Sequence, residues 1–205
     1  MPEPAKSPIA GSLERVECKS RAEWRRWLAR HYQQRESIWL VTYKKSGSRP
    51  DLYVPYSDLV EEGLCFGWID SRTARLDGDR TMLLFAPRKA GSVWSKVNKA
   101  LVARLIANGR MTPAGLAKIE AAKRDGSWTS LDEVEALVIP PDLGRALAAN
   151  KQAKVNWDKF PPSVRKRALS WIASAKQPAT RERRISETMA SVAQNQRPNP
   201  PKPRP

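Results

Sequence analysis

WIDSRTARLDGDRTMLLFAP, residues 68–87, is the clearest structural signal in the sequence. Two runs of apolar and β-branched residues flank the sequence DGD at 77–79, and an Asp-Gly pair tolerates the positive φ angles of a tight hairpin turn. The pattern predicts two antiparallel strands joined by this turn. A third strand is expected at 37–45, SIWLVTYKK, where aromatic and β-branched residues dominate.

Helical spacing of apolar residues predicts helices around these strands and a run of helices after them. Ser20 and Glu23 form a capping box in front of the first helix, and Ser92 is a possible cap for the third. Val97 and Leu116 are expected to face the core. The helices are expected at about 21–34, 56–66, 94–108 and 113–124, then at 131–137, from Pro140, from Pro161 and at 180–194.

Together these elements predict an α+β fold: a small antiparallel sheet with packed helices, followed by an all-helical C-terminal module. The last ten residues, QRPNPPKPRP, contain five prolines and no residue that builds a core. We expect a flexible N-terminal tail at 1–15, an α+β domain at 16–125, a helical module at 126–195 and a Pro-rich disordered tail at 196–205.

The composition is that of a globular protein. Of the 205 residues, 40% are hydrophobic and eight are Trp, which is enough for a substantial core. The two cysteines, Cys18 and Cys65, fall short of a disulfide framework. Neither a signal-peptide region nor a run of ~20 apolar residues occurs, so we expect a cytoplasmic protein without a transmembrane segment.

The chain carries a formal net charge of +16, which is distributed unevenly. Residues 151–205 hold 13 Lys and Arg against 3 Asp and Glu, whereas basic and acidic residues balance over 51–150. A basic surface attracts an anionic partner, which here means an acidic protein, nucleic acid phosphates or an anionic lipid surface. The alternative is that these residues only solvate their helices. The oligomeric state stays open.

Few residues suit catalysis or metal binding. His31 is the only histidine, and it lies on the apolar stripe of the first helix, where a packed residue is more common than a catalyst. Asp70, Asp77 and Asp79 suit turn chemistry as well as they suit a metal ion. Glycine-rich phosphate loops of the two common types do not occur. We therefore predict no catalytic residue, no cofactor and no metal site.

One cluster of residues around the hairpin suits a small ligand. A period of two would place Trp68, Asp70 and Arg72 on one strand face. The helix start that follows the hairpin is flanked by Arg88 and Lys89, which favours an anion there. The alternative is an ion pair between Asp70 and Arg88, with both tryptophans in the core. The candidate ligand-binding residues are Trp68, Asp70, Arg72, Arg88, Trp94, Ser95 and Asn98.

A second candidate site lies at the start of the last helix. Lys176, Arg181 and Arg184 put cations where the helix dipole favours anions, which invites a ligand phosphate. The alternatives are a neighbouring carboxylate of the same helix and docking of this helix onto the acidic segment 132–135. We predict an anion-binding role for the three cations.

Four blocks occur in order: VEEGLCFGWID (60–70), FAPRKAGSVWSKVN (85–98), GRMTPAGLAKIEAAK (109–123) and SWIASAKQPATRERRI (170–185). Over about residues 20–195 the chain resembles the YdeI/OmpD-associated family, whose C-terminal module is the OmdA, or bacteriocin-protection, domain. The resemblance implies a bacterial protein linked to protection against bacteriocins or cationic peptides and to an outer-membrane porin. It implies no catalytic residue.

These observations favour a non-enzymatic binding protein with a role in envelope stress that engages an anionic partner through its basic C-terminal helices. The alternative is a small-ligand receptor or enzyme that uses a Trp/Arg/Asp cleft at the hairpin. A third interpretation is a scaffold or dimer with exposed aromatic residues. Direct capture of a cationic peptide is disfavoured, because a protein of charge +16 repels it.

Overall fold

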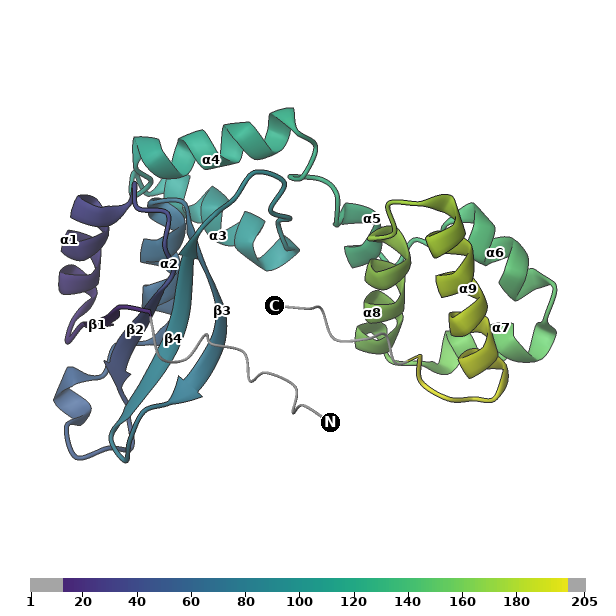
Figure 1. Ribbon diagram of the computed structural model, residues 1–205, viewed down its shortest axis with the longest axis horizontal. Coiled ribbons are helices and arrows are strands. Elements are labelled where there is room, and N and C mark those ends of the chain that lie inside the picture. The colour runs from purple at the N-terminus through teal and green to yellow at the C-terminus, as the bar shows by residue number, and fades with distance from the viewer. Residues whose placement is uncertain (1–12, 199–205) are drawn as a thin grey trace, which may run out of the picture. The chain divides into compact units, whose positions relative to one another are not determined.

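The computed structural model describes residues 13–198, so the predicted tails lie outside the described residues over 1–12 and 199–205. The chain forms two compact units, which meet in the sequence between Thr129 and Ser130. They are named here the N-terminal domain and the C-terminal domain (Figure 1). The predicted α+β fold with an all-helical C-terminal part is confirmed.

The sheet of the N-terminal domain contains β1 Arg15–Glu17, β2 Ile38–Tyr43, β3 Trp68–Arg75 and β4 Arg80–Pro87, in the order β1-β2-β4-β3. β3 and β4 pair antiparallel as predicted, and β2 pairs antiparallel with β4. The turn between β3 and β4 differs from the prediction, because neither Asp77 nor Gly78 has a positive φ; the Asp77 carboxylate instead accepts hydrogen bonds from the backbone amides of the two residues after Gly78. The sheet is mixed rather than purely antiparallel because β1 runs parallel to β2. β1 was not predicted, since a strand of three residues with one buried side chain, Val16, is too short to show a period.

Four helices accompany this sheet in the N-terminal domain: α1 Arg21–His31, α2 Tyr56–Cys65, α3 Lys96–Ala107 and α4 Pro113–Arg124. α2 is central, because it packs against α1, α3, α4 and β3 (Figure 1). Buried residues of the strands, such as Leu40 and Phe85, join buried residues of these helices in one core. A short 3₁₀ helix, η1 Pro50–Leu52, precedes α2.

Two of these helices present different faces from those predicted. Ser95 rather than Ser92 caps α3, and its hydroxyl accepts a hydrogen bond from a backbone N–H of the first turn at 3.2 Å. This start leaves Val97 68% exposed. Leu116 is 40% exposed, because α4 turns the small residue Gly115 toward the end of α2 instead.

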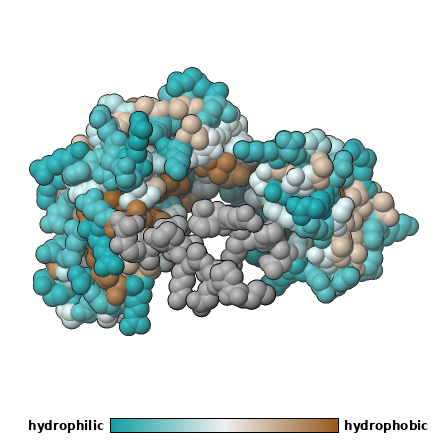
Figure 2. All heavy atoms as spheres, viewed as in Figure 1, coloured by the Kyte–Doolittle hydropathy of each residue, from teal (hydrophilic) through white to brown (hydrophobic). Residues whose placement is uncertain are grey.

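The opposite face of the sheet is apolar as well. Trp39, Val41 and Met82 form a buried cluster there, separate from the main core. On the face shown in Figure 2, hydrophobic residues gather over the strands of the N-terminal domain. The sheet therefore buries side chains on both of its faces.

A β-bulge in β3 corrects one prediction about the ligand site. The pairing of β3 with β4 shifts between Asp70 and Thr73, so the alternation of side chains changes phase there. The prediction that Arg72 shares a strand face with Trp68 and Asp70 is therefore wrong. Its guanidinium lies over the ring of Trp39 on the opposite face of the sheet, 5.5 Å from the ring centroid.

The C-terminal domain consists of α5 Asp132–Glu135, α6 Pro141–Ala148, α7 Lys151–Lys159, α8 Pro162–Ala173 and α9 Pro178–Ala193. Its own core includes Leu143, Trp157 and Val192. α7 was not predicted, because its sequence is mostly polar; it begins where the Asn150 side chain accepts a hydrogen bond from the Ala153 amide. In the described part of the chain, no helix combines the length and apolar character needed to cross a membrane. The cytoplasmic location stays a prediction.

Candidate anion-binding site

Arg88 is a buried cation at the end of β4, with only 2% of the residue exposed. Its guanidinium carbon lies 3.6 Å from the centroid of the Trp94 ring, and Nη1 donates a hydrogen bond to the Val93 carbonyl at 3.3 Å. Nε and Nη2 are buried and have no hydrogen-bond partner within residues 13–198. The side chain is thus held in place without a counter-charge in direct contact.

The charge of Arg88 persists at neutral pH despite this burial. Loss of water lowers the pKa of Arg88 to about 10, an effect that the negative charge of Asp70 opposes. An uncompensated buried charge destabilises a protein by roughly 3–5 kcal/mol. A cation–π contact such as the one with Trp94 offsets about 2 kcal/mol of this. Burial therefore disfavours the charge of Arg88, and the Trp94 ring and the Asp70 charge oppose this effect.

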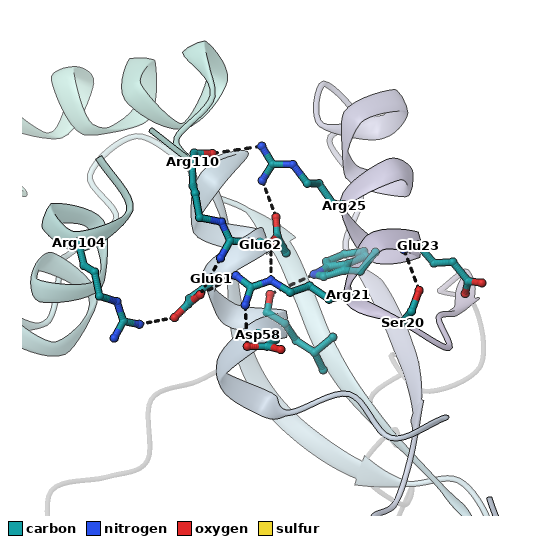
Figure 3. A network of polar contacts seen from close by, with 11 residues as sticks. Ser20, Arg21, Glu23, Arg25, Asp58, Glu61, Glu62, Arg104 and Arg110 are labelled. Carbon is teal, nitrogen blue, oxygen red and sulfur yellow. Dashed lines mark hydrogen bonds and ion pairs between the residues drawn. The ribbon is translucent and has the colours of Figure 1, made fainter. Parts of the chain in front are cut away.

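The buried acidic residues of the same domain, in contrast, are fully paired. Glu62 has a fully buried side chain and accepts three hydrogen bonds from arginines, two of them at 2.7 Å (Figure 3). Burial raises the pKa of Glu61, but hydrogen bonds and charges from arginines outweigh this effect and lower it overall. The arginines of this network are Arg21, Arg25, Arg104 and Arg110.

Sequence reasoning missed this network, although a signal was present. Glu61 and Glu62 interrupt the otherwise apolar helix sequence LVEEGLC, and both are buried. A carboxylate on a buried face requires a cation or several donors. Arg21 and Arg25 are four residues apart, so they lie on one face of α1. Both reach Glu62, and Arg21 also reaches Glu61.

Two cavities meet at Arg88. The larger one, about 530 Å³, is lined among others by Tyr32, Phe66 and Arg35. The smaller one, about 110 Å³, lies against the end of α4. The residues that line both cavities are Arg88, Lys89 and Lys118, and all three are cations. Among the described residues, no carboxylate lines the larger cavity.

Close packing of α4 against the end of α2 builds this cationic wall. A Cβ atom on Gly115 would lie 2.3 Å from the Cys65 carbonyl oxygen, so only glycine permits this approach. Gly67 follows α2 with a φ of +77°, and a Cβ there would lie 2.5 Å from Cγ of Lys118. The Gly67 carbonyl accepts a hydrogen bond from the Arg88 amide at 2.9 Å. One glycine thus positions both cations.

Two predicted residues of the hairpin site have structural partners. Trp68 is fully buried, and its Nε1 donates to the Tyr32 carbonyl at 3.3 Å. The Asp70 carboxylate accepts a hydrogen bond from the Tyr56 hydroxyl at 2.5 Å. Burial and this hydrogen bond raise the pKa of Tyr56 to about 12. Asp70 therefore acts on Arg88 as a nearby charge, and no direct ion pair between them is seen within the described residues.

Of the remaining predicted residues, the structure brings Arg88 and Trp94 together. Trp94 is 1% exposed and supports the guanidinium from below. Ser95 and Asn98 form the cap of α3, where the Ser95 hydroxyl accepts a hydrogen bond from the Asn98 backbone amide. Arg72 lies on the other face of the sheet. The structure thus keeps Arg88, Lys89 and the Trp94 ring together, and Lys118 joins them.

The three predicted cations of the C-terminal domain have different surroundings. Arg181 binds Asp142 with two hydrogen bonds, at 2.5 and 3.0 Å, and also donates to a carbonyl of α8 at 3.4 Å. Arg184 donates to the Trp171 carbonyl and to the Ser174 hydroxyl. Both arginines of α9 thus satisfy the C-terminal end of α8, where the helix dipole favours cations. Lys176 is exposed.

Two family models match the chain. One, described as a domain of unknown function (DUF8412), matches residues 16–118, and the other, OmdA, described as bacteriocin-protection, YdeI or OmpD-associated, matches residues 136–195. The chain belongs to the DUF8412 family and carries an OmdA domain. The resemblance to the YdeI/OmpD-associated family is thus confirmed over residues 136–195, whereas residues 16–118 match DUF8412. No curated protein and no solved structure matches the chain.

The larger cavity lies entirely within the DUF8412 domain, and the arginines that cap α8 lie within the OmdA domain. The cavity offers cations, amide groups and aromatic surface. No group of three or more potential metal ligands occurs among residues 13–198. Arg88, Lys89 and Lys118 suit electrostatic binding of an oxyanion.

Proposed function

We propose that this protein is a binding protein whose DUF8412 domain holds a small anion against Arg88. The observation that supports this most strongly is a buried guanidinium with two unpartnered nitrogens, at a wall of cations that two cavities share. A bound oxyanion would supply the missing counter-charge and accept charge-assisted hydrogen bonds. In this proposal, Arg88 has no counter-charge in direct contact because the structure is that of the receptor without its ligand.

The OmdA domain links this receptor to a family described as bacteriocin-protection. We propose that any such protection acts through the bound anion rather than through capture of a cationic peptide. The net charge of +16 opposes contact with a cationic peptide and favours contact with an anion.

Thermal unfolding at constant ionic strength, with phosphate replacing chloride, tests this proposal. We expect the melting temperature of the wild type to rise with the logarithm of the phosphate concentration above the Kd, because a ligand at 100 times its Kd stabilises the native state by about 2.7 kcal/mol. We expect Arg88→Met to lose this response. In chloride this variant should melt higher than the wild type, since it no longer buries an uncompensated charge.

Arg72→Met is the matched control. It removes another guanidinium that lies over a tryptophan, but one that is exposed on the opposite face of the sheet. It should respond to phosphate as the wild type does. If Arg88→Met also responds normally, or if the wild type does not respond, the proposal is wrong.

A second candidate function is contact between the C-terminal domain and an anionic macromolecule. The observation that favours it is a set of exposed cations on α7, α8 and the turn after α8 that form no ion pair within residues 13–198. Other cations of this domain are already paired, such as Lys154 with Asp158. The exposed, unpaired cations are Lys151, Lys159, Arg167 and Lys176.

Binding to DNA, RNA and anionic vesicles at several salt concentrations tests this second candidate. Affinity should fall steeply with salt, because phosphate contacts release counterions. The double variant Lys159→Gln/Arg167→Gln should bind more weakly than the control Lys154→Gln/Lys166→Gln, which removes the same charge from paired positions. Equal binding by the two double variants would contradict a role for the unpaired cations.

A further inference from the structure

We infer that the anion bound at Arg88 is the phosphate group of a small phosphate monoester with a planar ring, and this inference rests on the function proposed above. The shape and lining of the two cavities point to this class of ligand. Each cavity contributes a separate part of the argument.

The first step is charge. Arg88, Lys89 and Lys118 form the shared wall, and Arg35 adds a fourth cation to the larger cavity. The one carboxylate at the smaller cavity, Asp125, already accepts hydrogen bonds from two backbone amides. Several cations without a free carboxylate favour a multiply charged group over a single carboxylate. A phosphate monoester carries a charge of about −1.5 to −2 at pH 7.

The second step is the size and surface of the larger cavity. Its volume of about 530 Å³ is much more than an inorganic anion fills. Phe66 and Tyr32 present aromatic rings, with centroids 6.3 Å apart, and Ala114 and Ala117 form an apolar wall on α4. Stacking a planar ring of the ligand against these side chains would bury their apolar surface. A free phosphate ion would leave it wet.

The third step is the polar edge of the same cavity. Gln33 and Gln34 line it. Their amide nitrogens already donate to the Tyr32 hydroxyl at 3.1 Å and to the Glu36 carbonyl at 3.2 Å, and each amide also has a second N–H and a carbonyl oxygen. These groups suit the ring nitrogens and exocyclic groups of a heterocycle. The geometry therefore points to a phosphate at Arg88, Lys89 and Lys118, with a ring in the larger cavity against Tyr32.

Calorimetric titration of the full chain with inorganic phosphate, AMP and adenosine at fixed ionic strength tests this inference. We expect AMP to bind at least tenfold more tightly than phosphate, and adenosine to bind at least a hundredfold more weakly than AMP. If phosphate binds but AMP binds no more tightly, the inference is overturned while the anion site stands. If neither AMP nor phosphate binds, both proposals are overturned.

Two matched variants test whether the aromatic side of the larger cavity binds the ring of the ligand. Tyr32 and Tyr53 are each 37% exposed, but only Tyr32 lines the larger cavity. Tyr32→Ala should weaken AMP binding about tenfold and leave phosphate binding unchanged, whereas Tyr53→Ala should leave both unchanged. Equal AMP affinity in the wild type and Tyr32→Ala would overturn the placement of the ring.

Discussion

Arg72 and Arg88 both place a guanidinium against a tryptophan ring, but they differ in access to water. Arg72 is exposed, so solvent satisfies its remaining donors. Arg88 is 2% exposed and has donors that nothing satisfies among the described residues. The stacking contact of Arg72 is therefore ordinary surface packing, whereas that of Arg88 forms part of a candidate binding site.

Gly67 contacts both cations, because its carbonyl binds the Arg88 amide and its lack of a side chain leaves room for Lys118. Gly67→Ala should destabilise the domain by more than 2 kcal/mol: alanine at positive φ costs roughly 1–2 kcal/mol, and its Cβ would also collide with Lys118. Unfolding in urea, followed by tryptophan fluorescence, measures this loss.

Substitutions at two other glycines distinguish, in the same assay, the backbone strain of a positive φ from the steric clash with Lys118. Gly91 has a φ of +73° but open space around its Cβ position, so Gly91→Ala should show only the backbone penalty of roughly 1–2 kcal/mol. Gly78 has open space and no positive φ in this range, so Gly78→Ala should be nearly neutral. Equal losses at Gly67 and Gly91 would show that Lys118 is not held against Gly67.

At the scale of elements, the paired charges of Figure 3 connect α1, α2, α3 and the segment after α3. Glu62→Gln should destabilise the N-terminal domain by roughly 1.5–3 kcal/mol, because it removes the buried carboxylate that partly exposed arginines bind. Asp51→Asn breaks an ion pair between two exposed side chains and should have no measurable effect. A similar effect of both variants in urea unfolding would contradict a structural role for the network.

The pairing of α6 with α9 predicts a dependence of stability on pH. A hydrogen bond from Arg181 lowers the pKa of Asp142 below its usual value of 3.8. The stabilisation is therefore present above pH 3.8 and is lost as the pH falls through the lower pKa of the folded state. Asp142→Asn should melt below the wild type at pH 6, and this difference should shrink by pH 2. A constant difference would contradict the assignment.

Elements with a strong local pattern could be predicted, and those held by tertiary contacts could not. The hairpin of β3 and β4 could be predicted from its two apolar, β-branched runs around a turn sequence, and β2 from its aromatic and β-branched run. The parallel strand β1 is defined only by its neighbour, and α7 has few apolar residues. The bulge in β3 has no local signal, so the face of Arg72 was predicted incorrectly.

The candidate site shows the same limit. Arg88 was identifiable because it lies between a predicted strand and a predicted helix cap. Lys118 comes from α4, and only the close approach at Gly115 brings it to Arg88. Arg181 and Arg184 looked like ligands for an anion, because sequence does not reveal that the end of α8 lies beside them.

At the scale of the whole molecule, each domain has its own core, which predicts two unfolding transitions in calorimetry. Ile38 and Ile172 are both fully buried, one in each core. Ile38→Val and Ile172→Val should each destabilise one domain by roughly 0.5–1.5 kcal/mol. Each variant should therefore lower the temperature of a different transition and leave the other unchanged. A shift of both transitions by either variant would contradict this independence.

The division at Thr129 and Ser130 has a consequence for how such a protein arises. Each core is formed by one uninterrupted stretch of chain, and each stretch matches a different family. A single genetic junction is therefore enough to join either domain to a new neighbour without cutting through a core. Natural or laboratory recombination can therefore join the DUF8412 domain, with its proposed anion site, to other domains independently of the helical OmdA domain.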